Sequence, residues 1–233
     1  MIRPFLTAEW RHLVMVNYEV DAGLLEAYVP AGTQIDRHGG HCYASIVAFQ
    51  FLNTRVLGLP IPFHRDFSEL NLRFYVRRTA PGEVRRGVVF IREVVPRRAI
   101  ALIARAVYNE PYVTLPMRSS VDGAVRHEWS LAGRWQGVSA TPTGDAVEPL
   151  PGSHEEFITH HEWGYTRQRD GGTIEYRVVH DRWAVRRVAK LEVSADFRAL
   201  YGPALGAALT TPATAFVIDG SPVTVGAPSR SVP

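Results

Sequence analysis

Three side chains that together offer acid–base chemistry and anion binding alternate along one short segment, as Glu69, Asn71 and Arg73. On a strand, alternate residues point to the same side, so these three would share one face. If that face meets solvent, it is an ordinary charged surface. If it lines the inside of a curved sheet, it forms a polar pocket floor. In such a pocket, Arg73 or Arg105 would hold a carboxylate through two hydrogen bonds while Glu69 transfers a proton.

Lysine chemistry is restricted to one position, because Lys190 is the only lysine among the 26 lysine and arginine residues. Any reaction that needs a lysine amine must therefore use this residue. Lys190 follows a strand-like run at 183–188. We interpret it as a surface lysine whose alkyl stem lies along the protein.

The motifs that commonly mark cofactor, metal or nucleophile sites are absent: there is no GxSxG, no glycine-rich phosphate loop, no CxxC pair and no HExxH. The 9 histidines include two close pairs, His38 with His41 and His160 with His161. Neither pair has a third suitable ligand nearby. We therefore interpret both pairs as loop or helix surface, and expect no metal and no cofactor.

The formal charge of +3 and the isoelectric point near 9.2 raise the question of an anionic partner. The arginine pairs at 77–78, 85–86, 97–98 and 186–187 are spread along the chain between acidic residues. Nucleic-acid-binding proteins usually concentrate their basic residues in one patch or element. We therefore expect no nucleic acid partner.

A cytoplasmic location is the prediction from cysteine usage and hydropathy. Cys42 is the only cysteine, which excludes an intrachain disulfide and fits a reducing compartment. It lies in the apolar run 42–47, where we expect a small core residue. The opening segment 1–16 lacks the apolar core of a signal peptide. No segment approaches the roughly 20 apolar residues that span a bilayer, so we expect no membrane partner.

Runs rich in β-branched and aromatic residues predict a mostly β protein of the α+β class. The expected strands are 13–20, 43–52, 70–76, 87–95, 113–117, 125–131, 173–180, 183–188 and 214–218. The first and last of the expected helices are 22–29, capped by Asp21, and 196–209, interrupted by Gly202 and Pro203. Between them, a short helix is expected to begin at Ser153, where the sequence matches a capping box. The run 99–108 allows either a helix or a buried strand.

The remaining segments are expected to be irregular. We interpret 119–122 and 139–152 as loops, and 221–233, which is rich in proline and glycine, as a flexible C-terminal tail. No break in composition divides the rest of the chain. A single β-rich domain over 1–220 is therefore the simplest prediction.

Several motifs resemble one known family. They are LPIPFH at 59–64, ELNLRFYV at 69–76, GVVF at 87–90, EF at 156–157 with WGY at 163–165, and DGSPV at 219–223. Together they are similar to the family called domain of unknown function 2071, which belongs to the acetoacetate decarboxylase-like superfamily. The resemblance covers nearly the whole chain. It implies a cone-shaped, partly closed β-barrel with an internal pocket and a few flanking helices, and it is compatible with a homo-oligomer.

The resemblance fails at one position that matters for chemistry. In acetoacetate decarboxylase, a strand glutamate precedes a run that ends in Pro-Lys-Lys, and the first of these lysines forms a Schiff base. Glu69 is similar to that glutamate, and 105–111 resembles the approach to the lysines. After Pro111, however, the next residue is Tyr112. Tyrosine has no amine, so we do not expect a Schiff-base decarboxylase.

Two function classes stay open. In the first, the chain is a lysine-independent enzyme acting on a small keto acid or related carboxylate, with Glu69 and Tyr112 as catalytic residues. The substrate would be bound by four further residues, Arg73, Asn71, Arg105 and Tyr108. In the second, it is a non-catalytic module that binds a ligand or has a filled barrel. A filled barrel would require Glu69 and Arg73 to form ion pairs with Arg92 or Glu93, which would leave no cavity.

Overall fold

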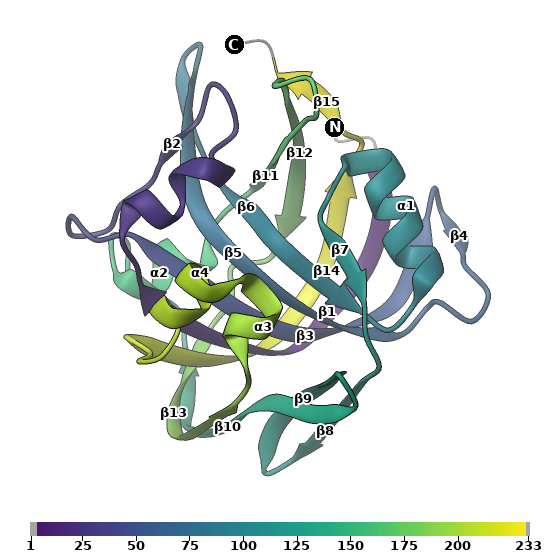
Figure 1. Ribbon diagram of the computed structural model, residues 1–233, viewed down its shortest axis with the longest axis vertical. Coiled ribbons are helices and arrows are strands. Elements are labelled where there is room, and N and C mark those ends of the chain that lie inside the picture. Colours follow the sequence, from purple (N-terminus) through teal and green to yellow (C-terminus); the bar gives the residue numbers. More distant parts are fainter. Residues whose placement is uncertain (1–3, 232–233) are drawn as a thin grey trace.

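Seven strands of the computed structural model, which describes residues 4–231, form a closed barrel (Figure 1). Around the barrel they run in the order β12, β11, β6, β5, β3, β1 and β14, and β14 pairs back with β12. Their bounds are β1 Pro4–Glu19, β3 Tyr43–Val56, β5 Phe67–Ala80, β6 Glu83–Val95, β11 Trp163–Arg167, β12 Thr173–His180 and β14 Thr214–Gly226. The prediction of a mostly β protein with a barrel is confirmed.

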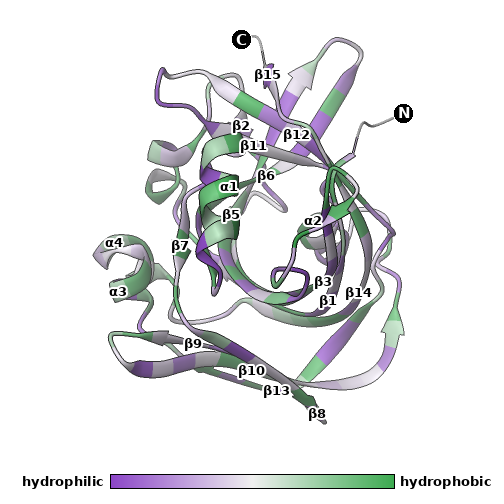
Figure 2. Ribbon diagram, turned by 90° about the vertical axis from the view of Figure 1, so that its right-hand side faces the viewer, coloured by the Kyte–Doolittle hydropathy of each residue, from purple (hydrophilic) through white to green (hydrophobic). Residues whose placement is uncertain are grey.

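A second layer of strands extends from β14 at one side of the barrel (Figure 2). It consists of β13 (Val185–Ser194), β10 (Arg134–Val147), β9 (Ala124–Leu131) and β8 (Met117–Asp122). Four short strands pair at the margins: β2 (Gln34–Ile35), β4 (Leu59–Pro60), β7 (Tyr112–Thr114) and β15 (Ser229–Ser231).

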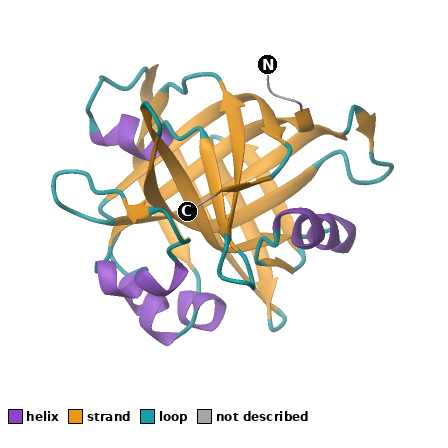
Figure 3. Cartoon of the chain, turned by 90° about the horizontal axis from the view of Figure 1, so that it is seen from above, coloured by secondary structure: helices purple, strands orange, loops and turns teal. Residues whose placement is uncertain are grey.

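The helices lie at the periphery of the strands (Figure 3). They are α1 (Arg98–Tyr108), α2 (His154–Thr159), α3 (Phe197–Tyr201) and α4 (Pro203–Ala208). The ambiguous run 99–108 is therefore helical. Ser153 caps α2 as expected, accepting a hydrogen bond from the Glu156 amide at 3.2 Å. None of the helices in residues 4–231 is both long enough and apolar enough to cross a membrane.

The barrel wall is buried on both faces because it separates two hydrophobic cores. The outer core packs Leu70, Leu72 and Phe74 of β5 against α3, α4 and the second layer. The inner core fills much of the barrel and includes Phe49 and Phe51 of β3. Strands buried on both faces carry apolar residues on both sides, as the pattern of 43–52 predicts.

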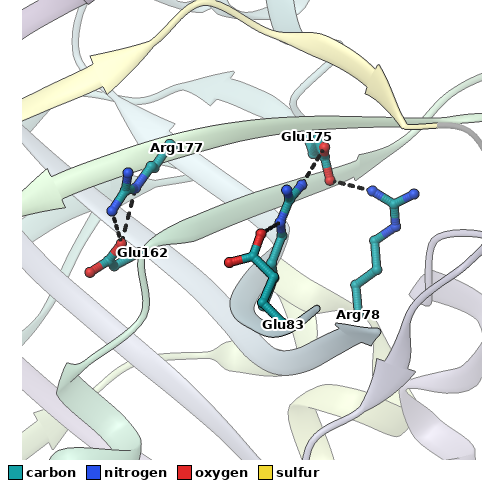
Figure 4. Close-up of polar contacts among 6 residues, drawn as sticks. Arg78, Glu83, Glu162, Glu175 and Arg177 are labelled. Atoms are coloured by element: carbon teal, nitrogen blue, oxygen red, sulfur yellow. Dashed lines mark hydrogen bonds and ion pairs between the residues drawn. The ribbon is translucent and has the colours of Figure 1, made fainter. Parts of the chain in front are cut away.

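Ionic contacts reinforce the closure where backbone pairing is weakest. The parallel pairing of β11 with β6 covers only Trp163 with Gly87 and Gly164 with Val88. Next to it, Glu175 of β12 accepts hydrogen bonds from Arg78 of β5 at 2.7 Å and from Arg85 of β6 at 2.9 Å (Figure 4). These contacts join β12 to the hairpin of β5 and β6, which lies far from it in the sequence.

Three expectations for local structure were wrong. The segment 22–29 forms two short 3₁₀ turns, Ala22–Leu24 and Glu26–Tyr28, instead of one helix. The segments 119–122 and 139–147 are strands, in β8 and β10, and not loops. Their polar composition reflects a partly exposed second layer, and their partners β9 and β13 supply the hydrogen bonds.

The expected flexible tail is also largely ordered. β14 continues to Gly226, pairing with β1 and β12, and β15 pairs with β12. Val223 is buried in the inner core, so this segment supplies part of the barrel wall. Residues 232–233 lie outside the described part of the chain.

Candidate functional site

A cavity of about 120 Å³ lies inside the barrel. One wall is formed by Glu69, Asn71 and Arg73, which are all at most 7% exposed and face inward from β5. The alternation seen in the sequence thus lies on the inside of a curved sheet. Most of the other lining residues are apolar or aromatic.

Two further glutamates, Glu93 and Glu110, line the same cavity. The pairing of β5 with β6 sets Glu93 beside Asn71, and the pairing of β6 with β7 sets it beside Tyr112. A register shift next to Arg73 leaves Ile91 as an additional residue on β6. Such a bulge changes which side chains face inward, so that Phe90 and Glu93 both reach the cavity.

Glu110 is placed by the turn that ends α1. Asn109 adopts the left-handed conformation, with a φ of 57°, and its amide donates to the Arg105 carbonyl at 3.1 Å. Asparagine tolerates this conformation better than most residues. The chain then reverses, and the Glu93 amide donates to the Pro111 carbonyl at 3.3 Å. This turn brings Glu110 and Tyr112 to the cavity together.

Glu69 and Tyr112 are in direct contact. The Tyr112 hydroxyl donates to Glu69 Oε2 at 3.0 Å, and Asn71 Nδ2 donates to Glu69 Oε1 at 3.0 Å. Burial raises the pKa of Glu69 to about 7, although both hydrogen bonds act in the opposite direction. A carboxyl group with this pKa exchanges its proton at neutral pH, as a general acid or base must.

The other two carboxyl groups, Glu110 and Glu93, are buried as well. Glu110 Oε1 accepts from Thr166 at 2.5 Å and from the Tyr176 hydroxyl at 2.8 Å. Burial raises the pKa of Glu110 to about 7. Burial, followed by the charge of Glu110, raises the pKa of Glu93 well above its ordinary value, which favours the protonated form of Glu93. A neutral carboxylic acid in a cavity can donate a hydrogen bond to a carbonyl oxygen.

Arg73 supplies a buried cation at the same wall. Its Nη2 donates to the Ile158 carbonyl at 3.2 Å, while its Nε has no hydrogen-bond partner. Within residues 4–231, no ion pair includes Arg73 or Glu69. The ion pairs required by a filled barrel are therefore not formed, and Arg92 instead donates to the Leu200 carbonyl. A buried guanidinium without a counterion favours a bound anion.

The remaining expected residues separate into two groups. Tyr108 lines the cavity with its ring, and its hydroxyl donates to the Gly226 carbonyl at 3.0 Å. Arg105 is exposed on α1 and donates to the Tyr112 carbonyl, so it does not reach the cavity. It was expected to hold a carboxylate, but the helix directs it outward. Lys190 is exposed on β13 and pairs with Glu192 at 2.8 Å.

Sequence reasoning missed Glu93, Glu110 and Tyr176 as members of the site. Glu93 is followed by two apolar residues in a strand-like run, which is a weak sign of a buried carboxyl group. The sequence gives no sign that Tyr176 belongs to the site. Its hydroxyl reaches Glu110 only because its ring packs against Gly164, which has no side chain. Within residues 4–231, no group of three or more acidic, histidine or cysteine side chains is arranged to hold a metal ion.

Residues 7–222 match the model of the family DUF2071, described as an uncharacterized conserved protein. The chain belongs to the DUF2071 family. This DUF2071 protein is also 34% identical to the uncharacterized protein YqjF of Bacillus subtilis (strain 168) over 115 residues, which cover 49% of the chain and 46% of YqjF. The match thus spans less than half of that relative.

Solved structures share the fold of this DUF2071 protein at low sequence identity. Acetoacetate decarboxylase from Legionella pneumophila has a TM-score of 0.70 and 11% identity, with 98% of this chain and 87% of that chain covered. The enduracididine biosynthesis enzyme MppR complexed with pyruvate has a TM-score of 0.66 and 15% identity, with 99% and 91% covered. An acetoacetate decarboxylase-like enzyme from Sphingomonas wittichii RW1 has a TM-score of 0.65 and 14% identity, with 97% and 92% covered.

Proposed function

We propose that this DUF2071 protein binds a small 2-keto acid in the barrel cavity and moves a proton at the carbon next to the keto group, without a Schiff base. The observation that carries this proposal is the contact of 3.0 Å between Glu69 and Tyr112 in the cavity wall. It joins a carboxyl group that titrates near neutral pH to a hydroxyl donor. The structure of MppR with pyruvate supports the choice of ligand class.

The carboxylate of the keto acid would lie at Arg73. The guanidinium is buried, has an unpaired Nε and lacks an acidic partner among the described residues. Arginine binds carboxylates through two parallel hydrogen bonds. The bound anion would also compensate a buried positive charge, which is unfavourable on its own.

The proton transfer uses a base and a hydrogen-bond donor that lie close together in the cavity wall. Ionised Glu69 accepts a proton from that carbon, and the electron pair of the C–H bond moves into a carbon–carbon double bond. The keto oxygen gains the negative charge of an enolate. Tyr112 or protonated Glu93 donates a hydrogen bond to this oxygen, which stabilises the charge in a site sheltered from water. The proton on Glu69 exchanges with water, and Glu69 then returns a solvent-derived proton to the carbon. The keto acid is restored, and the net result is exchange of a carbon-bound proton with solvent.

Proton exchange on pyruvate is the direct test. In D₂O, the methyl signal of pyruvate in ¹H NMR should decay faster with the wild-type protein than in buffer alone. Glu69→Gln should abolish the added rate, because glutamine does not accept the proton. Glu192→Gln, at an exposed position, and Lys190→Arg, which leaves no lysine, should retain it.

Two results would count against the proposal. An added rate that survives in Glu69→Gln would exclude Glu69 as the base. Pyruvate that stabilises the protein in a thermal-shift assay without any added exchange would restrict the function to ligand binding, the second class that the sequence leaves open.

A further inference from the structure

One side of the cavity is an aromatic wall that the proposed proton transfer does not use. Trp10 packs edge-to-face against Phe49 and Phe51, with ring centroids 5.2 and 5.7 Å apart. Phe51 stacks on Phe67 at 4.7 Å. All four rings line the cavity. A pyruvate methyl group would leave this wall without a partner.

A second part of the cavity lining is also apolar. Ile100, Ile103 and Ala104 line the cavity from α1, at the spacing that places residues on one face of a helix. The Tyr108 ring, one turn further along α1, packs against Phe5 at 5.4 Å and Tyr176 at 4.7 Å. A flat group inserted here would have aromatic rings on two sides, and aromatic pairs favour such contacts.

The order of groups along β5 gives the ligand a direction. From Arg73, the inward-facing residues are Asn71, Glu69 and then Phe67. The pairing with β3 adds Phe49 beside Glu69 and Phe51 beside Phe67. The wall therefore presents a cation, an amide, a carboxyl group and then aromatic rings. An arylpyruvate presents its groups in the matching order of carboxylate, ketone, acidic methylene and ring.

The cavity is of the size of one such ring. Its volume of about 120 Å³ is somewhat smaller than the roughly 150 Å³ of an apolar cavity that binds benzene, so a ring together with its keto acid group requires the cavity to widen on binding. Carboxylate and ketone would occupy the polar end of the space, next to Arg73 and Asn71.

We propose that the 2-keto acid bound here carries an aromatic ring on the reacting carbon, as in the arylpyruvate class. The inference rests on the proposed function, whose site it completes. The ring lies between the aromatic wall of β1, β3 and β5 and the apolar face of α1. This position sets the methylene carbon beside Glu69.

Calorimetric binding to the wild-type protein gives the first test, with pyruvate, phenylpyruvate and benzyl alcohol as ligands. Burial of a phenyl group should make phenylpyruvate bind about 10- to 100-fold more tightly than pyruvate. Benzyl alcohol, which has the ring but no carboxylate, should bind more weakly than phenylpyruvate. Phenylpyruvate should also exchange its methylene protons faster than pyruvate exchanges its methyl protons.

A pair of variants on α1 locates the ring. Ala104→Phe fills the apolar side of the cavity and should weaken phenylpyruvate binding at least tenfold while changing pyruvate binding little. Ala106→Phe adds the same side chain at an exposed position of the same helix and should change neither. If Ala104→Phe does not fold, Ala104→Leu serves with a smaller volume, and the wild-type ligand series stands by itself.

The outcomes separate this inference from the proposed function. Equal affinities for pyruvate and phenylpyruvate, unchanged in Ala104→Phe, would overturn the aromatic site and leave the keto acid site standing. Benzyl alcohol binding as tightly as phenylpyruvate would overturn the carboxylate site and leave an aromatic pocket. Absence of binding by all three ligands would overturn both.

Discussion

Glu69 is a buried carboxyl group that the fold holds at a cost in stability. Burial raises its pKa from 4.5 to about 7. The folded protein therefore binds this proton more tightly than the unfolded chain does. The stability that comes from protonated Glu69 is fully present below about pH 4.5 and is lost as the pH rises to about 7.

Glu69→Gln should remove this pH dependence, because glutamine stays neutral. We expect the free energy of unfolding to change little at pH 4.5 and to rise by about 2–3 kcal/mol at pH 8, relative to wild type. Urea denaturation at both pH values measures this difference. Glu192→Gln is the control with the opposite sign, since the hydrogen bond from Lys190 lowers the pKa of Glu192. A Glu69→Gln effect that is the same at both pH values would contradict this account.

Tyr112→Phe removes the hydroxyl that donates to Glu69. This hydrogen bond lowers the pKa of Glu69, so its loss should raise that pKa further. The rate of pyruvate proton exchange depends on ionised Glu69, and its pH profile should therefore shift to higher pH in the variant. NMR exchange rates between pH 5 and 9 measure the shift. A lower rate with an unmoved profile would mean that Tyr112 acts only on the keto oxygen.

At the scale of elements, the site depends on short segments that fit closely together. Gly164 of β11 lies against the Tyr176 ring of β12, and a Cβ at this position would be 2.2 Å from the Tyr176 Cζ atom. Tyr176 in turn donates to Glu110. The absence of a side chain at 164 therefore allows Tyr176 to reach a carboxyl group in the connection between α1 and β7.

Gly164→Ala should destabilise the protein by about 2 kcal/mol or more, because the ring must move. Chemical denaturation measures the cost. In a Tyr176→Ala background, the same substitution should cost much less, since the clashing ring is absent. Equal costs in the two backgrounds would show that the backbone, and not the ring, requires glycine.

At the scale of the whole molecule, the barrel is closed by contacts between segments that are distant in sequence. Glu175 holds two arginines from β5 and β6, and its side chain is only 10% exposed. Glu162 pairs with Arg177 nearby, but that pair is more than 40% exposed (Figure 4). Glu175 and Glu162 therefore allow a buried ionic contact to be compared with an exposed one.

Glu175→Gln should lower the free energy of unfolding by about 2 kcal/mol, because it removes the buried charge that Arg78 and Arg85 share, although Arg85 keeps its contact with Glu83. Glu162→Gln should lower it by less than about 1 kcal/mol, since water screens the exposed pair. Urea denaturation of both variants at pH 7 gives the comparison. Similar small losses in both would mean that backbone pairing alone closes the barrel.

The sequence by itself determined the strand content and excluded Schiff-base chemistry at Tyr112. It also showed that Glu69, Asn71 and Arg73 share one face of a strand, but it left open whether that face meets solvent or lines the inside of a curved sheet. These features are local, since a period of two or a missing amine is visible in the order of residues. The tertiary structure decided which way the polar face of β5 points, because curvature arises only when β12 pairs with β14.

The tertiary structure also decided the composition of the site. A bulge on β6 turned Glu93 inward, and a left-handed turn at Asn109 carried Glu110 into the cavity, while the helix before it directed Arg105 to solvent. The C-terminal strands became ordered only through pairing with β1 and β12. Such pairings join residues that are far apart in the chain, and the free energy that selects them comes from burial of the complete barrel. Local sequence patterns do not contain this contribution to the free energy of folding.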